Sequence, residues 1–388
     1  MALDLSASKK GKVLPDHEIR DLIDAGAVRG IDSDSSLVNS GSLDLRLRGD
    51  RIWRIRGSPN PLRGQPVEDL LSNKELTDEI LEDKNGSNFR MERDQSYVFP
   101  LEVELDLPEG ISARLFDKSS RGRVGTYVRT LTDGNPRINI VPPGYTGKLY
   151  TEVCATAFSE IVVPGETTVP QIRFYYGEPS PIEGAGLWNL IKKGIDGPIL
   201  WRDGEPVDLS EEEEAMAINE GLLTFTADLG GDVMAYKAKK EDKRTFDFSK
   251  RNHYHPENFF YPERRGEGIN LHPGDFALIH AREMIRLNPN ICAEIPEWES
   301  KLRRMVSHYA GMVNPGHGFR EDPREYDKGN VVFEVSPATS SLYIQDGAPI
   351  AYFNVYWMAQ EPEEEYEKVK STGFKGLESI LPKQFRKG

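Results

Sequence analysis

The sequence predicts a mainly β protein made of two copies of one domain, each with short flanking helices. Short strand-like runs separated by proline and glycine dominate residues 97–176, and this spacing favours a β-barrel or sandwich over a parallel sheet. Features of the first half recur in the same order in the second half, which indicates a tandem duplication. The 388 residues suffice for two or three domains of ordinary size. We therefore expect a first β domain at residues 1–178, a linker at 179–209, and a second β domain with a charged C-terminal tail at 210–388.

The first domain is expected to open with a helix at residues 13–26. Pro15 and Asp16 precede an apolar stripe of isoleucine and leucine, and Gly26 ends it, which is typical of a capped amphipathic helix. A second, surface helix is expected at residues 66–83, where apolar residues recur at helical spacing. The expected strands of this domain include residues 42–47, 51–56, 98–105, 160–165 and 171–176.

The second domain repeats this order. Residues 210–221 have a capping box formed by Ser210 and Glu213 and a terminal glycine, so we match this expected helix to the one that ends at Gly26. A strand pair is expected at residues 224–239. Later matches lie at a nearly constant offset of 180 to 182 residues. They pair Ser120 with Ser300, Arg123 with Arg303, Glu152 with Glu334, and Gly165 with Gly347.

Two segments have no counterpart in the first copy. Residues 240–265 are rich in charged and aromatic side chains, and we expect an inserted loop region of the second copy there. The tail at residues 361–388 begins acidic and ends basic, as solvated termini often do. Within it, residues 371–376 have the glycine and aromatic composition of a lid.

Composition excludes several classes of protein. A formal net charge of −14 disfavours a general nucleic-acid binder, although a local cationic pocket can still take a small anionic ligand. Cys154 and Cys292 are far apart and form no C-x-x-C pair, which favours a reducing compartment and argues against structural zinc. No apolar run approaches the ~20 residues that cross a bilayer, and no secretory signal is present. We expect a cytoplasmic protein with no membrane partner.

Residues 117–123 have the composition of a phosphate-binding turn. The adjacent hydroxyls of Ser119 and Ser120, the neighbouring cations and the glycines can all approach anionic oxygens closely. A polar turn between two strands is the alternative interpretation, because short motifs often match by chance. Glu152 follows in an otherwise apolar strand, and a carboxylate is seldom buried there without a partner or a task.

In this order, the motifs resemble the dCTP deaminase and dUTPase superfamily, and most of all its dCTP deaminases. The resemblance covers most of the chain outside the linker, the insert and the tail. In the first copy it is carried by residues 119–125 (SSRGRVG), 143–147 (PGYTG), Glu152, 163–165 and 171–174. In the second copy it is carried by residues 270–278 and 310–316.

The resemblance implies a dUTPase-like distorted β-barrel or jelly roll (a β-clip domain) that assembles as trimers or pseudo-trimers, with nucleotide sites between neighbouring units. Ser119, Ser120 and Arg123 would contact the nucleotide, and Lys118 stands where the family usually has arginine. Glu152 would be the catalytic acid and base, with Arg123 and Ser119 beside it in the catalytic set. Gly144 and Tyr145 would frame the base and sugar.

The two copies depart from the family pattern in different places. Pro142 occupies the position of the family's hairpin aspartate, and Glu299 replaces the first serine of the second turn, where its charge disfavours phosphate. The second copy keeps Asn314 in its hairpin and Glu334 opposite Glu152. Ser300 and Arg303 are its remaining candidate nucleotide-binding residues. We hypothesise that the turn of one copy works with a hairpin and glutamate of a neighbouring unit.

The expected reaction is hydrolysis of dCTP to dUTP and ammonia, in which a glutamate activates water at C4 of cytosine. Zinc deaminases use an H-x-E and P-C-x-x-C set that this sequence lacks, and its seven histidines have no metal-binding spacing, so we expect no zinc and no protein metal site. Mg²⁺ would arrive with the triphosphate. A dUTPase-like or bifunctional enzyme that forms dUMP, and a non-catalytic nucleotide-binding protein, are the alternatives.

Overall fold

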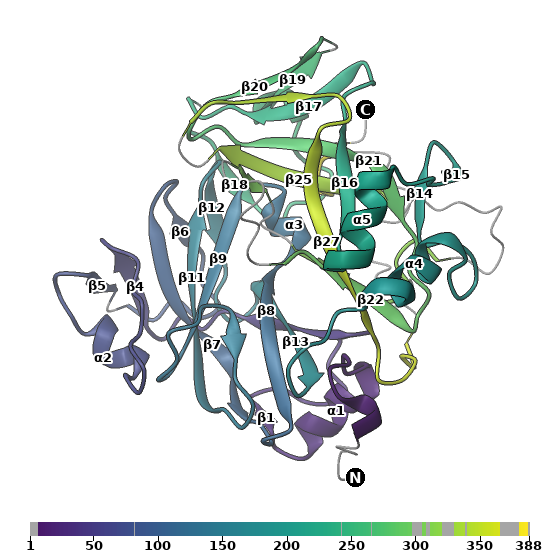
Figure 1. Ribbon diagram of the computed structural model, residues 1–388. Coiled ribbons are helices and arrows are strands. Elements are labelled where there is room, and N and C mark those ends of the chain that lie inside the picture. The colour runs from purple at the N-terminus through teal and green to yellow at the C-terminus, as the bar shows by residue number, and fades with distance from the viewer. Residues whose placement is uncertain are drawn as a thin grey trace. The chain divides into compact units, whose positions relative to one another are not determined.

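The computed structural model describes residues 7–80, 82–241, 243–264, 266–296, 305–307, 311–319, 330–337, 340–364 and 380–386. The chain divides into two compact units, coloured in sequence order in Figure 1. Unit 1 comprises Met1–Pro179 and Lys243–Lys250, and unit 2 comprises Ser180–Asp242 and Arg251–Gly388. No helix in the described ranges is long and apolar enough to span a membrane.

Unit 1 is mostly antiparallel sheet. Its helices are the 3₁₀ turn η1 (Ala7–Lys9), α1 (Asp16–Asp24), α2 (Val67–Leu71) and α3 (Ser119–Gly122). Its strands are β1 (Val28–Arg29), β2 (Val38–Asn39), β3 (Ser42–Arg46), β4 (Ile52–Ile55), β5 (Thr77–Ile80), β6 (Phe89–Met91), β7 (Ser96–Asp106), β8 (Ile111–Asp117), β9 (Thr126–Thr132), β10 (Ile140–Val141), β11 (Thr146–Ala155), β12 (Ser159–Val162), β13 (Thr168–Tyr176) and β18 (Thr245–Asp247).

These strands form three sheets. One has the order β5-β4-β7-β11-β9 with β1 on β7, the second is β10-β8-β13-β3-β2, and the third is β18-β12-β6. A small apolar cluster, which includes Trp53, Val98, Leu131 and Tyr150, fills the space between the first sheet and α2. This cluster places α2 over the part of β11 that leads to Glu152.

Unit 2 contains the remaining elements. Its helices are α4 (Gly184–Lys192), α5 (Glu211–Glu220) and the 3₁₀ turn η2 (Pro256–Asn258). Its strands are β14 (Leu200–Arg202), β15 (Glu205–Pro206), β16 (Leu223–Asp228), β17 (Val233–Ala238), β19 (Phe260–Arg264), β20 (Gly268–Leu271), β21 (Ala277–Ile285), β22 (Ile291–Glu294), β23 (Met305–Ser307), β24 (Met312–Val313), β25 (Asn330–Pro337), β26 (Leu342–Gln345) and β27 (Pro349–Trp357).

Strand pairing confirms the duplication. The run β4-β7-β11-β9 of unit 1 has its counterpart in the pairs β17·β21, β21·β25 and β25·β23 of unit 2. The run β10-β8-β13-β3 corresponds to β24-β22-β27-β16, the pair β1·β7 to β14·β21, and the pair β6·β12 to β20·β26. The corresponding strands also follow one another in the same order along the chain, so both units have the same topology.

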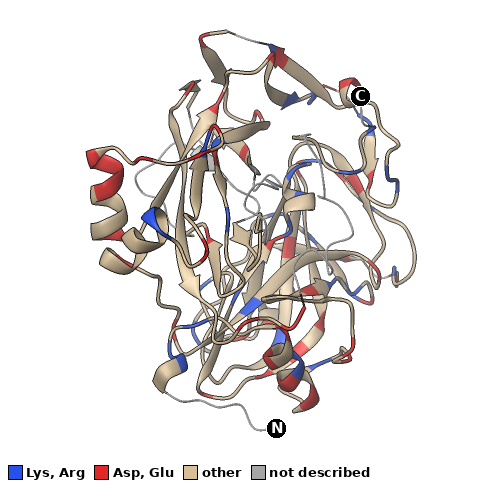
Figure 2. Cartoon of the chain, turned by 90° about the vertical axis from the view of Figure 1, so that its right-hand side faces the viewer, with Lys and Arg blue, Asp and Glu red and all other residues tan. Residues whose placement is uncertain are grey.

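The helices at the start of each copy correct one of our matches. The expected helices at residues 13–26 and 210–221 both exist, as α1 and α5, and each is followed by a left-handed glycine, Gly26 or Gly221. The capping box of Ser210 and Glu213 is present, and Figure 2 shows the acidic first turn of α5 in red. However, α4 precedes β14 as α1 precedes β1, so α4 is the topological counterpart of α1 and α5 is an addition.

Three expected segments differ from the structure. The surface helix at 66–83 stops at Leu71. The segment Thr77–Ile80, with a β-branched residue at each end, forms β5, which pairs with β4. The segment expected as a linker, 179–209, contains α4, β14 and β15 of unit 2, because its apolar side chains enter that unit's core. Part of the expected insert at 240–265, the residues of β18, belongs to unit 1.

Candidate active site

The α3 turn, defined as residues 118–125, connects β8 to β9. The half-buried Ser119 and Ser120 form its first residues, and no hydrogen bond joins either hydroxyl to another side chain of the described chain. The buried Asp117 carboxylate accepts the backbone N–H of Val128 at 3.0 Å, which closes the turn onto β9. Two hydroxyls are thereby held on a short, fixed loop and remain available to a ligand.

Gly125 ends the turn for a steric reason. Its φ is +80°, and a Cβ atom at this position would lie 2.6 Å from Cβ of Ala157. Its carbonyl accepts both the N–H and the hydroxyl of Thr156 at 2.8 Å. No residue with a side chain fits this close approach, so the glycine of the SSRGRVG motif fixes how β9 leaves the turn.

The three cations of the turn have different surroundings. Lys118 donates its ammonium to Asp44 at 2.6 Å and to Thr168 at 2.9 Å, so it ties the turn to β3 and β13. Arg123 follows α3 as its C-cap residue and is 8% exposed. Arg121 points into the protein toward Glu160, at 3.5 Å.

Burial has a larger effect than the ion pair on the pKa values of Arg121 and Glu160. Glu160 is fully buried and accepts the hydroxyl of Thr126 at 2.5 Å. Its burial raises the pKa to about 7 in spite of the nearby guanidinium. Burial also lowers the pKa of Arg121 to about 10, partly offset by the charge of Glu160. The guanidinium lies 3.4 Å from the ring centroid of Phe248, which supplies a second favourable contact.

Glu152 lies in the middle of β11 and is 4% exposed. One carboxylate oxygen accepts the hydroxyl of Ser58 at 2.7 Å, and the other accepts the guanidinium of Arg129 at 2.7 Å. Arg129 also donates to Asn60 at 2.7 Å. Glu152 and Arg129 are register partners across β11 and β9, so the backbone itself sets this pair side by side.

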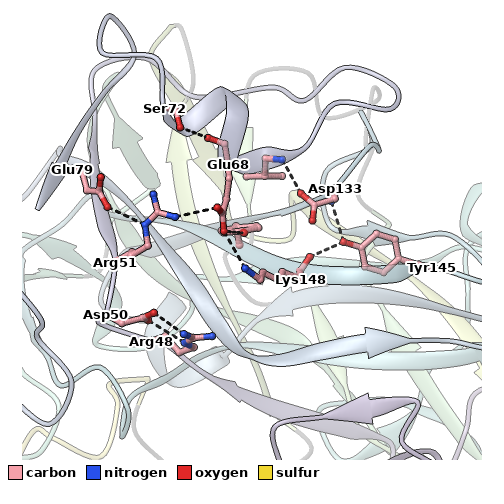
Figure 3. A network of polar contacts seen from close by, with 11 residues as sticks. Arg48, Asp50, Arg51, Glu68, Ser72, Glu79, Asp133, Tyr145 and Lys148 are labelled. Atoms are coloured by element: carbon pink, nitrogen blue, oxygen red, sulfur yellow. Dashed lines mark hydrogen bonds and ion pairs between the residues drawn. The ribbon is translucent and has the colours of Figure 1, made fainter. Parts of the chain in front are cut away.

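The helix α2, which follows the segment that carries Ser58 and Asn60, is held by a polar network around Glu68 (Figure 3). Glu68 accepts the hydroxyl of Tyr150 at 2.7 Å, the guanidinium of Arg51 at 3.0 Å and the ammonium of Lys148 at 3.2 Å. Lys148, Tyr150 and Glu152 alternate along β11 and therefore share one face. The network and the catalytic candidate thus lie on the same side of the sheet.

The Pro-Gly-Tyr hairpin has a structural explanation of its own. Gly144 takes a φ of +70°, as the turn requires. Tyr145 is buried, and its hydroxyl donates to the carbonyl of Lys148 at 2.6 Å and accepts the N–H of Asp133 at 3.0 Å (Figure 3). Burial raises the pKa of this phenol. The hydroxyl is therefore engaged with the backbone, and the N–H of Gly144 donates to the carbonyl of Pro108 at 3.2 Å.

Unit 1 brings the turn and Glu152 onto neighbouring elements without direct contact between them. Arg129, the register partner of Glu152, lies three residues beyond the first residue of β9, which at ~3.3 Å per residue is a distance of about 10 Å. The glutamate that directly contacts the turn is Glu160. Glu152 is therefore connected to the turn through Arg129 and β9.

The second copy is described in part. Glu334 is buried in β25 and is the register partner of Leu278 in β21, just as Glu152 pairs with Val98 of β7. Asn314 follows β24 and is buried. Ser300, Arg303 and Glu299 lie outside the described residues.

Both halves of the chain match models of one enzyme family. The model described as the 2'-deoxycytidine 5'-triphosphate deaminase (DCD) N-terminal domain matches residues 10–178, and the model of the C-terminal domain of the same enzyme matches residues 202–385. The chain belongs to the dCTP deaminase family. The first match ends at residue 178, next to the boundary between the units at Pro179, and the second begins at residue 202.

Relatives of this dCTP deaminase family member match different shares of the chain. The dCTP deaminase, dUMP-forming, of Corynebacterium kroppenstedtii is 27% identical over 189 residues, which are 48% of this chain and 94% of that protein. The protein of the same description from Kocuria rhizophila is 28% identical over 193 residues, 49% of this chain and 94% of that protein. The crystal structure of 2'-deoxycytidine 5'-triphosphate deaminase from Agrobacterium tumefaciens matches with a TM-score of 0.76 and 26% identity, covering 89% of this chain and 99% of that chain. This match confirms the expected fold class, two dUTPase-like β domains in tandem.

Sequence reasoning missed several residues around the candidate site. Arg129 and Ser58 become visible only once β11 is registered against β9 and the 57–66 segment is placed on the sheet. Glu160 shares with Glu152 the signal of a lone carboxylate in an apolar strand, and that signal could have found it. Phe248 gave no signal, because its contact with Arg121 joins distant parts of the chain.

Proposed function

We propose that this protein catalyses hydrolytic deamination of dCTP to dUTP and ammonia, with Glu152 as the general base and acid. The observation that carries the proposal is the buried Glu152 carboxylate, which Ser58 and Arg129 hold on the strand beside the α3 turn. Membership of the dCTP deaminase family supports the substrate. A carboxylate fixed in this way can take a proton from water and return it without moving far.

In the proposed reaction, water adds to C4 of cytosine and the amino group leaves as ammonia. As the new C–O bond forms and the C4=N3 double bond opens, Glu152 removes a proton from the attacking water and delivers it to N3. It then removes the proton of the C4 hydroxyl and delivers it to the departing nitrogen as the C4=O bond forms and the C–N bond breaks, which returns Glu152 to its carboxylate form. Arg129 and Ser58 act on the carboxylate, since each donates to one of its oxygens. No zinc is required, because proton transfer through one glutamate replaces a metal-bound hydroxide.

We assign the triphosphate to the α3 turn. The hydroxyls of Ser119 and Ser120 and the guanidinium of Arg123 are donors that suit anionic oxygens. Lys118 adds positive charge from its position against Asp44. The accompanying Mg²⁺ is part of the substrate, coordinated by phosphate oxygens and water.

The test is the rate of ammonia release from dCTP by Glu152→Gln. Loss of a general base costs on the order of 10²- to 10⁴-fold in rate, so we expect at least a hundredfold drop with the fold intact. Glu334→Gln is the matched variant in the second copy. Its rate of ammonia release shows whether the glutamate of that copy contributes to deamination. Wild-type rates in both variants would overturn the glutamate mechanism, and no ammonia from the wild-type chain would favour a non-catalytic nucleotide-binding protein.

A bifunctional enzyme that converts dCTP to dUMP is the second candidate. It is favoured by the names of the relatives from Corynebacterium kroppenstedtii and Kocuria rhizophila, which are described as dUMP-forming. Pyrophosphate measured alongside ammonia separates the two reactions. Release of ammonia with accumulation of dUTP supports an enzyme that only deaminates. Equal amounts of ammonia and pyrophosphate from dCTP support the bifunctional enzyme. Pyrophosphate that forms from dUTP but not from dCTP supports a dUTPase-like activity.

We also propose a cytoplasmic homo-oligomer based on trimers. Family membership supports the assembly, and Cys154 and Cys292 form no disulfide bond, which suits a reducing compartment. Sedimentation equilibrium of the full chain tests the assembly, because a monomer at the concentrations used for assay would contradict it.

A further inference from the structure

A strand from the second half of the sequence completes a sheet of unit 1. We call Lys243–Lys250 the strap. Its strand β18 lies parallel to β12, with Ser159 opposite Thr245 and Glu160 opposite Phe246 (Figure 1). Phe246 is fully buried, and its ring meets that of Phe248 edge-on at 5.0 Å between centroids. The strap is thus an integral part of unit 1, although strands of unit 2 flank it in sequence.

The strap contacts the α3 turn through Arg121. The guanidinium of Arg121 lies between the ring of Phe248, at 3.4 Å, and the carboxylate of Glu160, at 3.5 Å. Arg121 belongs to the turn itself, because its N–H donates to the carbonyl of Lys118 at 2.8 Å and its carbonyl accepts the N–H of Val124 at 3.0 Å. Whatever fixes this side chain also fixes the backbone between Ser120 and Arg123.

A guanidinium that is 6% exposed cannot be moved without cost, since it would lose a carboxylate and an aromatic face at once. The polar and charged groups around it are Glu160 from β12, Thr126 from β9 and Asp247 from the strap, whose charge also raises the pKa of Arg121. The neighbouring Ser119 and Ser120 have no comparable restraint. Phe248 is therefore the contact by which the strap can hold the turn.

We propose that the strap positions the α3 turn for the phosphates of the nucleotide, with Phe248 and Arg121 as positioning residues. The inference rests on the proposed function of the turn as the triphosphate site. The ring of Phe248 keeps Arg121 in place, and the turn then presents two hydroxyls and the Arg123 guanidinium in one fixed arrangement. The strap accordingly sets affinity for a polyphosphate and takes no part in proton transfer at Glu152.

The experiment uses the full chain with Phe248→Leu, which keeps an apolar side chain but removes the aromatic face. We expect KM for dCTP and the Kd for inorganic tripolyphosphate to rise about tenfold, as loss of a desolvated cation–π contact implies, while kcat stays within about twofold of wild type. Phe248→Tyr keeps the ring and should restore wild-type values. Tyr261→Ala is the matched control, because it removes another ring that contacts a cation, Lys239 at 4.3 Å, and belongs to neither the strap nor the α3 turn.

Several results would overturn the proposal. Unchanged tripolyphosphate affinity in Phe248→Leu, or a fall in kcat at constant KM, would contradict a positioning role. Equal losses in Phe248→Leu and Tyr261→Ala would point to a general effect on stability. Tripolyphosphate binding needs no deamination, so its dependence on Phe248 supports the positioning role of the strap even if no ammonia is released. Failure of the wild-type chain to bind tripolyphosphate overturns the proposal.

Discussion

At the scale of single residues, unit 1 contains two buried glutamates in contrasting settings. Glu152 accepts hydrogen bonds from Arg129 and Ser58, whereas Glu160 is fully enclosed and faces the guanidinium of Arg121 at 3.5 Å. The sequence shows both as lone carboxylates in apolar strands, and it cannot separate them, because their partners come from other strands. The strand register shows that Glu152 faces Arg129 of β9, whereas Glu160 lies opposite Met91 of β6 and Phe246 of β18.

The enclosed carboxylate should make stability depend on pH. Burial raises the pKa of Glu160 from 4.5 to about 7, so between these values the folded chain binds more protons than the unfolded chain. The contribution of Glu160 is therefore complete below pH 4.5 and is lost as pH rises through about 7, a change on the order of 3 kcal/mol. Urea denaturation of wild type and Glu160→Gln at pH 5, 6, 7 and 8 measures it.

Glutamine cannot titrate, so the difference in free energy of unfolding between wild type and Glu160→Gln isolates the carboxyl group. This difference should fall steadily as the pH rises from about 5 to about 7. A flat difference would mean that the carboxyl group has its ordinary pKa in the folded chain. A rising difference would mean that the pair with Arg121 outweighs burial.

At the scale of elements, local signals predicted the capped helices and the five expected strands of the first copy, which are β3, β4, β7, β12 and β13, but not the end of α2. Proline, aspartate, the capping box and glycine marked α1 and α5 correctly, because caps depend on neighbouring residues alone. The expected helix at 66–83 was wrong beyond Leu71, since Thr77–Ile80 gains a cross-strand partner in β4. Arg56 and Asp78 pair across these strands at 2.6 Å, an interaction that no local window reveals.

The element α2 should support catalysis through Glu68. Glu68→Ala removes the acceptor of Tyr150, Arg51 and Lys148, and we expect it to lower the free energy of unfolding by about 1 kcal/mol, since the two ion pairs are partly exposed and screened. Loosening of α2 should also displace Ser58 from Glu152 and reduce kcat for ammonia release several-fold.

The matched control is Glu79→Ala, because Glu79 also pairs with Arg51 at 2.9 Å but lies on β5 and lacks the bond to Tyr150. We expect it to leave kcat near the wild-type value. Limited proteolysis should cut residues 57–66 faster in Glu68→Ala than in Glu79→Ala. Equal kcat in the two variants would show that α2 does not position the site.

At the scale of the whole molecule, the duplication was predictable and the strap was not. The repeat leaves matching residues at a nearly constant offset, and the strand pairs follow the same order in both units. The α3 turn and Glu152 could likewise be selected as candidate site residues from their motifs. The pairing of β18 with β12, by contrast, joins Thr245 to Ser159, and no pattern near either residue encodes such a distant parallel contact.

Divergence of the two copies predicts one nucleotide per chain. The second copy has Glu299 at the position that corresponds to Ser119, and a carboxylate there repels a triphosphate. Isothermal titration of Glu152→Gln with dCTP and Mg²⁺ should therefore give a stoichiometry near one for each chain. Two equivalent sites would contradict the divergence, whereas a second site that appears only in Glu152→Gln/Glu299→Ser would identify that carboxylate as the group that closes the second copy to phosphate.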